Sequence, residues 1–196
     1  MKRMFNIMQT DFCTTTAAED RPFPSPANCS NPELNITIYF AAHAHPFNLP
    51  HPDHFRVFNK PLSHWLDGIR AEADVVVILH LYLHFSQFNL EVFNLHAQDA
   101  QRGVARLLRR NPRARVVLRG PHVTYKGWPS HVAGGDLLAE HFHQILRREF
   151  TDVRHRVCYL NAWDMTVAVA NLNFHPEEFV HRAMLQVVFA HFIGRG

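Results

Sequence analysis

Two residues near the C-terminus, Asp164 and His175, have the types and order of a hydrolase acid–base pair. Asp164 follows a predicted strand that ends at Leu160, and His175 stands directly before Pro176, where a helix is predicted to begin. In serine hydrolases of the open α/β type, the histidine accepts the serine proton and the acid fixes the tautomer of the histidine. The spacing therefore indicates an Asp–His pair, although a structural histidine at a helix start has the same pattern.

The serine that such a pair would activate has no motif support. The chain contains no Gly-Asp-Ser, because Gly135-Asp136 is followed by Leu137, and no serine lies in a Gly-x-Ser-x-Gly setting. The serines present are Ser25, Ser30, Ser63, Ser86 and Ser130. Without its serine, a triad keeps only residual effects of binding and electrostatics. The sequence therefore predicts a catalytically inactive or incomplete site.

The 16 histidines raise the alternative of a His-rich metal-binding module. Zinc needs three or four converging ligands. His141 and His143 diverge on a predicted helix, and His80 and His84 lie about 13 Å apart in an extended chain. The remaining candidates gather in one predicted loop, namely His43, His45, His51, Asp53 and His54. We therefore assign no metal ligand and expect no cofactor, and the metal-binding module stays an alternative.

The elements that would position these residues alternate between helix and strand from residue 62 onward. Strands are predicted at 74–79, 115–119 and 156–160, and helices at 62–73, at 91–110, from 135 and from 176. The continuous apolar run at 75–79 is typical of a strand buried on both faces of a parallel sheet. The fold class is therefore α/β, a mostly parallel sheet in a three-layer sandwich. Functional residues of such sheets lie on the loops after the strands, here after Leu79, Leu118 and Leu160.

The small net charge of the chain argues against a nucleic-acid partner. The formal net charge is only +3, and the basic residues of the helix at 91–110 lie opposite its apolar side. Arg102, Arg106 and Arg109 are therefore interpreted as a solvated helix face rather than a nucleic-acid surface. No apolar run approaches the roughly 18 residues of a membrane span.

The N-terminal segment has a different composition. Residues 1–32 are predicted to be an irregular and poorly ordered lead-in, since their second half is polar and Pro-rich. They do not form a signal peptide. The domain proper is expected to span residues 33–196. The three cysteines, Cys13, Cys29 and Cys158, allow at most one internal disulfide, and their redox state is open. Two glycosylation triplets begin at Asn28 and Asn35, and each also has an ordinary loop or strand interpretation.

The region from Leu160 to Ala168, followed by 173–176, resembles the C-terminal signature of the neurexophilin and PC-esterase (NXPE) family. That signature reads roughly Asp-Ala-Trp-(Asp or Glu)-(Met or Ile)-Thr, a short variable stretch, and His-Pro. The segments 77–93 and 106–119 resemble the preceding strand, the His-Phe-x-x-Phe motif and the Arg-rich helix of the family. The resemblance covers roughly residues 33–193, and residues 1 to about 32 fall outside it.

This resemblance implies a fold like that of SGNH/GDSL hydrolases, related to carbohydrate O-acetyl esterases and transferases. It implies that His175 is the general base and that the supporting acid is Asp164 or the position of Asn161. It further implies a secreted or secretory-pathway glycoprotein, with glycosylation at Asn28 and Asn35, and a glycan or acylated carbohydrate as partner. His84, in the first loop, is a possible lining residue, and the oligomeric state is open.

Three departures from the family pattern weigh against activity. The Gly-Asp-Ser element would precede every segment seen here, so the domain is expected to be N-terminally incomplete. Asn161 replaces the first acid of the Asp-Ala-Trp block, and an amide there could cost about 10⁴-fold in rate. His122 stands where family members keep an asparagine, which removes a candidate oxyanion or substrate-binding amide.

The sequence therefore favours a non-catalytic or incomplete NXPE-like domain that binds a glycan or a partner. The first alternative is an active carbohydrate O-acyl esterase or acyltransferase that uses His175 and Asp164. The metal-binding module is the second alternative, and an unrelated α/β binding domain is the third.

Overall fold

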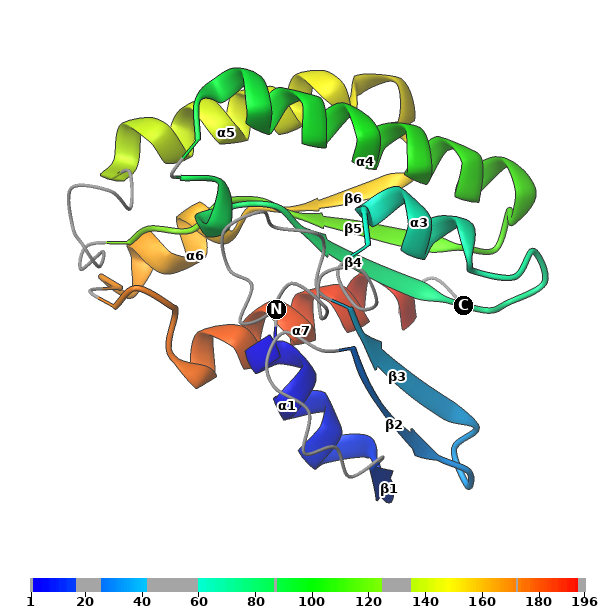
Figure 1. Cartoon of the computed structure of the whole chain (residues 1–196). Coiled ribbons are helices and arrows are strands. Elements are labelled where there is room, and N and C mark those ends of the chain that lie inside the picture. The colour runs from blue at the N-terminus through cyan, green and yellow to red at the C-terminus, as the bar shows by residue number, and fades with distance from the viewer. Residues whose placement is uncertain are drawn as a thin grey trace. The chain divides into compact units, whose positions relative to one another are not determined.

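The computed structural model describes residues 2–16, 26–41, 60–86, 88–124, 135–171 and 173–193 (Figure 1). The chain divides into two units, residues 1–65 and 66–196. Residue 32, where the sequence suggests a division, lies in a turn between two strands of the first unit. Each unit is described separately below.

A parallel sheet of three strands forms the centre of the second unit. Its strands are β4 (Val76–His80), β5 (Arg115–Arg119) and β6 (Val157–Leu160), in the order β4-β5-β6. Figure 1 shows α4 and α5 on one side of this sheet and α7 on the other. The helices of this unit are α3 (Leu62–Asp67), which begins at the end of the first unit, α4 (Leu90–Arg110), α5 (Gly135–Glu149), α6 (Ala162–Ala168) and α7 (Glu178–Ile193), with short 3₁₀ turns η1 (Leu83–Phe85) and η2 (Thr151–Val153). The prediction of an α/β fold with a parallel sheet and covering helices is confirmed.

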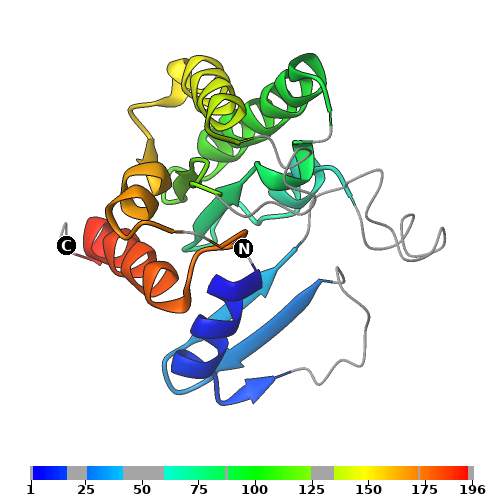
Figure 2. The same ribbon diagram turned by 90° about the vertical axis from the view of Figure 1, so that its left-hand side faces the viewer.

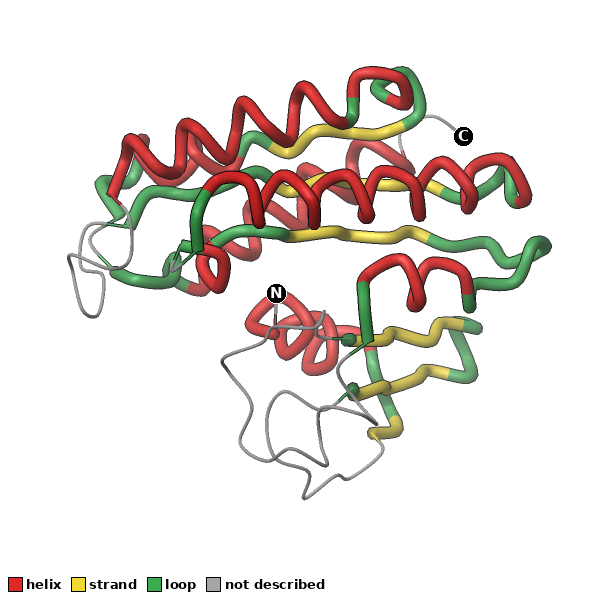
Figure 3. The backbone as a smooth tube through the Cα atoms, turned by 45° about the horizontal axis from the view of Figure 1, so that its top comes forward, coloured by secondary structure: helices red, strands yellow, loops and turns green. Residues whose placement is uncertain are grey.

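The central strand of this sheet is β5. Residues 116–119 of β5 are all buried, because the strand has neighbours on both edges and helices on both faces (Figure 3). The prediction that β4 is buried on both faces is wrong, since Val76 is 38% exposed. Within the described residues β4 is an edge strand, and this position explains its partial exposure.

Helix α4 forms because its sequence supplies both a cap and an apolar stripe. Asn89 is the N-cap, and its side chain accepts a hydrogen bond from the Val92 amide at 2.9 Å. The buried side of the helix faces the core through Phe93, Ala97, Ala100, Val104 and Leu107.

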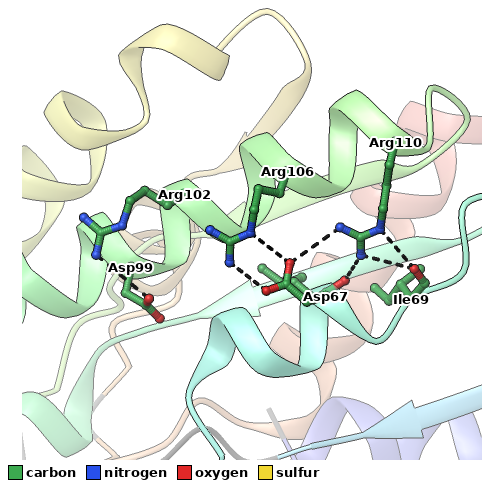
Figure 4. Close-up of polar contacts among 7 residues, drawn as sticks. Asp67, Ile69, Asp99, Arg102, Arg106 and Arg110 are labelled. Carbon is green, nitrogen blue, oxygen red and sulfur yellow. Dashed lines mark hydrogen bonds and ion pairs between the residues drawn. The ribbon is translucent and has the colours of Figure 1, made fainter.

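The basic side of α4 is only partly the solvated face that the sequence predicted. Arg102 and Arg109 are exposed, whereas Arg106 is half-buried and binds the Asp67 carboxylate through Nε at 3.0 Å and Nη2 at 2.7 Å. Arg110 also approaches Asp67, at 3.6 Å, and donates to the backbone carbonyls of Leu66 and Ile69 (Figure 4). These arginines therefore fasten the end of α3 and the following turn to α4.

One C-terminal element differs from the sequence prediction. Residues 161–166 were expected to be loop, whereas residues 162–168 form helix α6 with Asn161 as its N-cap. The predicted helix after Pro176 is confirmed. The buried side of α7 includes Leu185 and Val188, whereas Val187 is 45% exposed.

The first unit contains a helix where the sequence suggested an irregular lead-in. Helix α1 (Lys2–Phe12) buries Met4, Phe5 and Ile7, so the predicted irregularity is wrong for residues 2–12. These apolar residues are too few to predict a helix alone, and their burial depends on tertiary packing. Phe5, for example, lies 5.9 Å from Phe40 between ring centroids.

The sheet of the first unit is antiparallel and has three strands. They are β1 (Thr15–Thr16), β2 (Ala27–Asn31) and β3 (Ile36–Phe40), with β2 in the centre (Figure 2). A disulfide joins Cys13, just after α1, to Cys29 in β2, and Cys158 is not part of it. No helix in the described ranges is long and apolar enough to cross a membrane.

Candidate functional site

Polar residues gather at the carboxyl ends of the parallel strands, where the sequence predicted a site. His80 ends β4 and Arg119 ends β5, and the two residues are partners in the strand register. The His80 Nδ1 atom lies 3.3 Å from the Arg119 carbonyl oxygen. This pairing brings the loop after β4 next to the loop after β5.

His122, in the loop after β5, is buried and contacts two residues at and after the end of β4. Its ring stacks on His80 at 5.9 Å between centroids and meets Tyr82 edge-on at 5.0 Å. Only 1% of His122 is exposed, and Arg119 is buried to the same extent. Tyr82 and Thr124 are also buried, so the floor of this region is polar and closed to solvent.

The hydrogen bonds of His122 fix its tautomer. The Nε2 atom lies 3.3 Å from the Phe174 carbonyl oxygen, and the Nδ1 atom lies 3.4 Å from Arg119 Nη2. A carbonyl oxygen can only accept and a guanidinium can only donate, so Nε2 holds the proton and Nδ1 accepts. Burial and the nearby Arg119 charge keep the pKa of His122 well below 6.5, in agreement with a neutral ring.

The neighbouring groups follow the same electrostatics. Burial, together with the charge of Arg119, lowers the pKa of His80 well below 6.5, although the Arg119 carbonyl opposes this shift. Burial lowers the pKa of Arg119 to about 10, which leaves the guanidinium charged at neutral pH. Burial also raises the pKa of Tyr82, with a smaller opposing effect of the Thr124 hydroxyl. One buried cation therefore lies among neutral rings.

The loop after β5 is tied to the segment that bears His175. The Val123 amide donates to Thr166 Oγ1 at 3.0 Å, and Asn171 Nδ2 donates to the Val123 carbonyl at 2.8 Å. Together with the contact between His122 and the Phe174 carbonyl, these bonds bring His175 into the electrostatic environment of His122. The three loops that the sequence singled out thus converge.

Asp164 and His175 lie on the exposed side of this region. The Asp164 carboxylate accepts a hydrogen bond from Asn161 Nδ2 at 2.7 Å, and Asn161 Oδ1 accepts from the Asp164 amide at 3.4 Å. The ring of His175 meets the ring of Phe174 at 4.8 Å. The hydrogen bond of Asp164 is thus directed to Asn161, and the pairing of Asp164 with His175 stays a prediction.

A second polar pair lies between α5 and β6. The Tyr159 hydroxyl and His143 Nδ1 are 3.0 Å apart, and burial raises the pKa of Tyr159 and lowers that of His143. Asp164 has a smaller, opposing effect on the pKa of His143. Gly120 makes room for this pair, because a Cβ atom at Gly120 would lie 2.9 Å from Tyr159 Cζ.

Other predicted residues take ordinary structural positions. His84 is half-buried in η1, and Tyr82, from the same loop, contacts His122. Ser86 Oγ donates to the Leu83 carbonyl at 2.7 Å. Ser25 and Ser130 lie outside the described residues.

Metal-ligand geometry is not found in the part of the chain that the structure describes. No group of three or more His, Cys, Asp or Glu side chains there could hold a metal ion. The histidines between His43 and His54, together with Asp53, lie outside the described residues. The described part therefore gives the metal-binding alternative no support.

Sequence reasoning missed the buried part of the site, above all Arg119 and Tyr82. Arg119 directly follows three apolar residues of a buried strand, and this juxtaposition was the signal that could have identified it. Tyr82 has no comparable signal, because aromatic residues are common in cores. His80 was weighed only as a metal ligand, and its partnership with Arg119 depends on the strand register.

Comparison with known proteins identifies the family of the chain. The model of the NXPE family member 4-like C-terminal domain matches residues 2–192, whereas no solved structure matches the chain. The matched region begins at residue 2, so the expectation that residues before about 33 fall outside the resemblance is wrong. The chain therefore belongs to the NXPE family, as a member 4-like C-terminal domain.

Proposed function

We propose that this domain binds an acylated carbohydrate at the loop end of its parallel sheet and does not hydrolyse it. The observation on which this proposal depends is the hydrogen bond from Asn161 Nδ2 to the Asp164 carboxylate, at 2.7 Å. The Asp164 carboxylate, which would orient His175, already accepts this hydrogen bond from the N-cap of α6. Together with the lack of a Gly-Asp-Ser element in the sequence, this supports binding without acyl transfer.

The region has features suited to a neutral, hydroxyl-rich ligand. Its floor is held rigid by the bonds of His122, and rigid support improves affinity because less conformational entropy is lost on binding. His175 and Asp164 are exposed, and Trp163 and Phe174 are half-buried aromatics of the same segment. Aromatic faces beside a few polar groups are typical of small-ligand sites.

The secretory pathway is proposed as the location of the domain. A disulfide between Cys13 and Cys29 supports this proposal, since disulfides persist in oxidising compartments. The resemblance to a family whose members generally enter the secretory pathway supports it independently.

The proposal is tested by offering the purified chain one oligosaccharide in O-acetylated and de-acetylated forms. Chemical-shift changes of the amides around His122 and Phe174 report binding, and released acetate reports hydrolysis. We expect saturable shifts with the acetylated form and no acetate above the buffer rate. Acetate release that is lost in His175→Ala would contradict the proposal.

One observation favours a second candidate, a carbohydrate O-acyl esterase or acyltransferase. His175 is exposed where the loops converge, so a substrate could reach its ring. In that case His175 would act as general base, and Asp164 would support it after leaving Asn161. The acetate assay distinguishes the two candidates.

A further inference from the structure

The turn between β2 and β3 presents an asparagine in a conformation and position that favour modification. Asn35 is exposed and has a φ of 51°, a left-handed conformation that asparagine tolerates better than most residues. Hydrogen bonds define the turn: the Asn35 amide donates to the Pro32 carbonyl at 3.2 Å, and the Leu34 amide donates to Asn31 Oδ1 at 3.1 Å. Thr37, two residues later, is exposed as well. The triplet Asn35-Ile36-Thr37 thus begins in the turn and continues into the first two residues of β3, and all three residues are exposed.

The other triplet, Asn28-Cys29-Ser30, lies in a different environment. It occupies β2, the central strand of the antiparallel sheet, where Asn28 pairs with Tyr39. Cys29 is 1% exposed and forms the disulfide with Cys13. The Ser30 hydroxyl lies 2.7 Å from the Thr15 hydroxyl, so the triplet is fixed at all three of its residues.

We propose that Asn35 is the N-glycan acceptor of this domain, and that the Cys13–Cys29 disulfide prevents the glycosylation of Asn28. The inference rests on the proposed secretory route, because the donor of the reaction is a lipid-pyrophosphate-linked oligosaccharide of that pathway. The Asn35 side-chain nitrogen forms a bond to the anomeric carbon of the donor. The bond from that carbon to the pyrophosphate oxygen breaks, the lipid pyrophosphate leaves with the electron pair, and the amide loses one proton.

The disulfide separates the two asparagines because of where it lies. Cys29 is the middle residue of the Asn28 triplet, and its partner is only 16 residues earlier in the chain. The cross-link can therefore form as soon as both cysteines have entered the oxidising compartment, and it fixes the triplet in the strand. No cysteine lies within or beside the Asn35 triplet, so Asn35 stays available before and after the hairpin folds.

The exposed apolar side chains of this hairpin give the glycan a physical role. Leu34 and Tyr39 are 57% and 75% exposed, and Leu34 directly precedes Asn35. A branched sugar on Asn35 would shield Leu34 from water and from other chains, as glycans are bulky and solubilising.

The experiment uses the full chain expressed in a mammalian cell line behind a cleavable secretion leader. Glycosylation is measured as the intact-mass loss on treatment with a peptide N-glycanase, and the site is measured by mass spectrometry after release in ¹⁸O water. Asn35→Gly removes the acceptor without straining the left-handed turn, because glycine accepts that conformation. Thr37→Ala and Thr37→Ser form a matched pair that removes or keeps the hydroxyl, and Asn28→Gln tests the other triplet.

We expect one glycan in the wild-type chain, Asn28→Gln and Thr37→Ser, and none in Asn35→Gly and Thr37→Ala. In Cys13→Ser a second glycan is expected on Asn28, and it is read from the cell lysate if this variant is retained in the cell. A wild-type chain with no glycan, with a glycan on Asn28, or a single-glycan Cys13→Ser would overturn the inference. The free-thiol count of the same samples tests the secretory route separately, since a chain with three free thiols would contradict that route.

Discussion

At the scale of single residues, the floor of the site is built from histidines that stay neutral. His80 and His122 both have pKa values well below 6.5, with burial as the largest cause and the Arg119 charge next. The unfolded chain therefore binds more protons than the folded chain when the pH falls below about 6.5. Their contribution to stability is complete above that pH and is lost progressively as the pH falls towards the folded-state values.

The lowered pKa values of His80 and His122 predict that the free energy of unfolding depends on pH. Each of the two histidines contributes up to about 1.4 kcal/mol per pH unit to the decline of unfolding free energy below pH 6.5. In His122→Asn we expect the slope between pH 6.5 and 5 to decrease by about that amount, as measured by urea denaturation at each pH. The matched control is His155→Asn, at an exposed turn position, which should keep the wild-type slope. Equal slopes in wild type and His122→Asn would contradict the assignment of a neutral His122.

Gly120 gives a second prediction at the residue scale. A Cβ atom there would lie 2.9 Å from Tyr159 Cζ, closer than side chains normally approach. Gly120→Ala should therefore lower the unfolding free energy by about 1–3 kcal/mol. Tyr159→Ala removes the clash, so the same Gly120→Ala change should cost much less in that background. A double-mutant cycle measures this coupling, and additive effects would refute the proposed contact.

At the scale of elements, the turn after α3 is held to α4 by Asn111 more than by the exposed ion pairs. Asn111 is completely buried; its Nδ2 donates to the Ala73 carbonyl at 2.7 Å and to the Arg70 carbonyl at 3.2 Å. Its Oδ1 accepts from the Arg113 and Ala114 amides, each at 3.1 Å. By contrast, the Asp67–Arg106 pair is about 40% exposed at both side chains.

The two contacts should therefore respond differently to substitution. Asn111→Ala leaves buried backbone groups without hydrogen-bond partners, so it should lower the free energy of unfolding by about 2–4 kcal/mol. Asp67→Asn should cost at most about 1 kcal/mol, because an exposed ion pair contributes little in water. Thermal or urea denaturation of both variants tests the order. A larger loss for Asp67→Asn would mean that the ion pairs determine how this turn is held.

The start of α6 gives the second prediction at the element scale. Asn161 both caps the helix and donates to Asp164, whereas an aspartate at 161 could cap but would repel that carboxylate. Asn161→Asp should therefore lower the free energy of unfolding by about 0.5–1 kcal/mol at pH 7, a value reduced because Asp164 is exposed. Urea denaturation at pH 7 tests this, and a variant as stable as wild type would contradict it.

At the scale of the whole molecule, the sequence predicted those helices and strands that depend on the local pattern of apolar and polar residues. The strand at 115–119 and the apolar side of the helix at 91–110 follow directly from residue order, and both agree with the structure. The convergence of three loops followed from the rule that parallel strands share a carboxyl edge. Helix α1 could not be predicted, because its few apolar residues depend on packing against the sheet of the first unit.

Within the site, the exposed residues were easier to predict than the buried ones. Asp164 and His175 stand in a recognisable motif, whereas the contacts of Arg119 with His122 depend on a loop whose path no local pattern specifies. The pairing of Asn161 with Asp164 was missed for a similar reason, since residues 161–166 were interpreted as loop rather than as a capped helix.

The central proposal is that His175 activates no serine for acyl transfer. The most direct test is the intact mass of the purified chain after treatment with an organophosphonate, a reagent that labels serines activated by a histidine base. The account predicts an unchanged mass, while an authentic serine hydrolase in the same tube is fully labelled. A single adduct on one serine, abolished in His175→Ala, would contradict it.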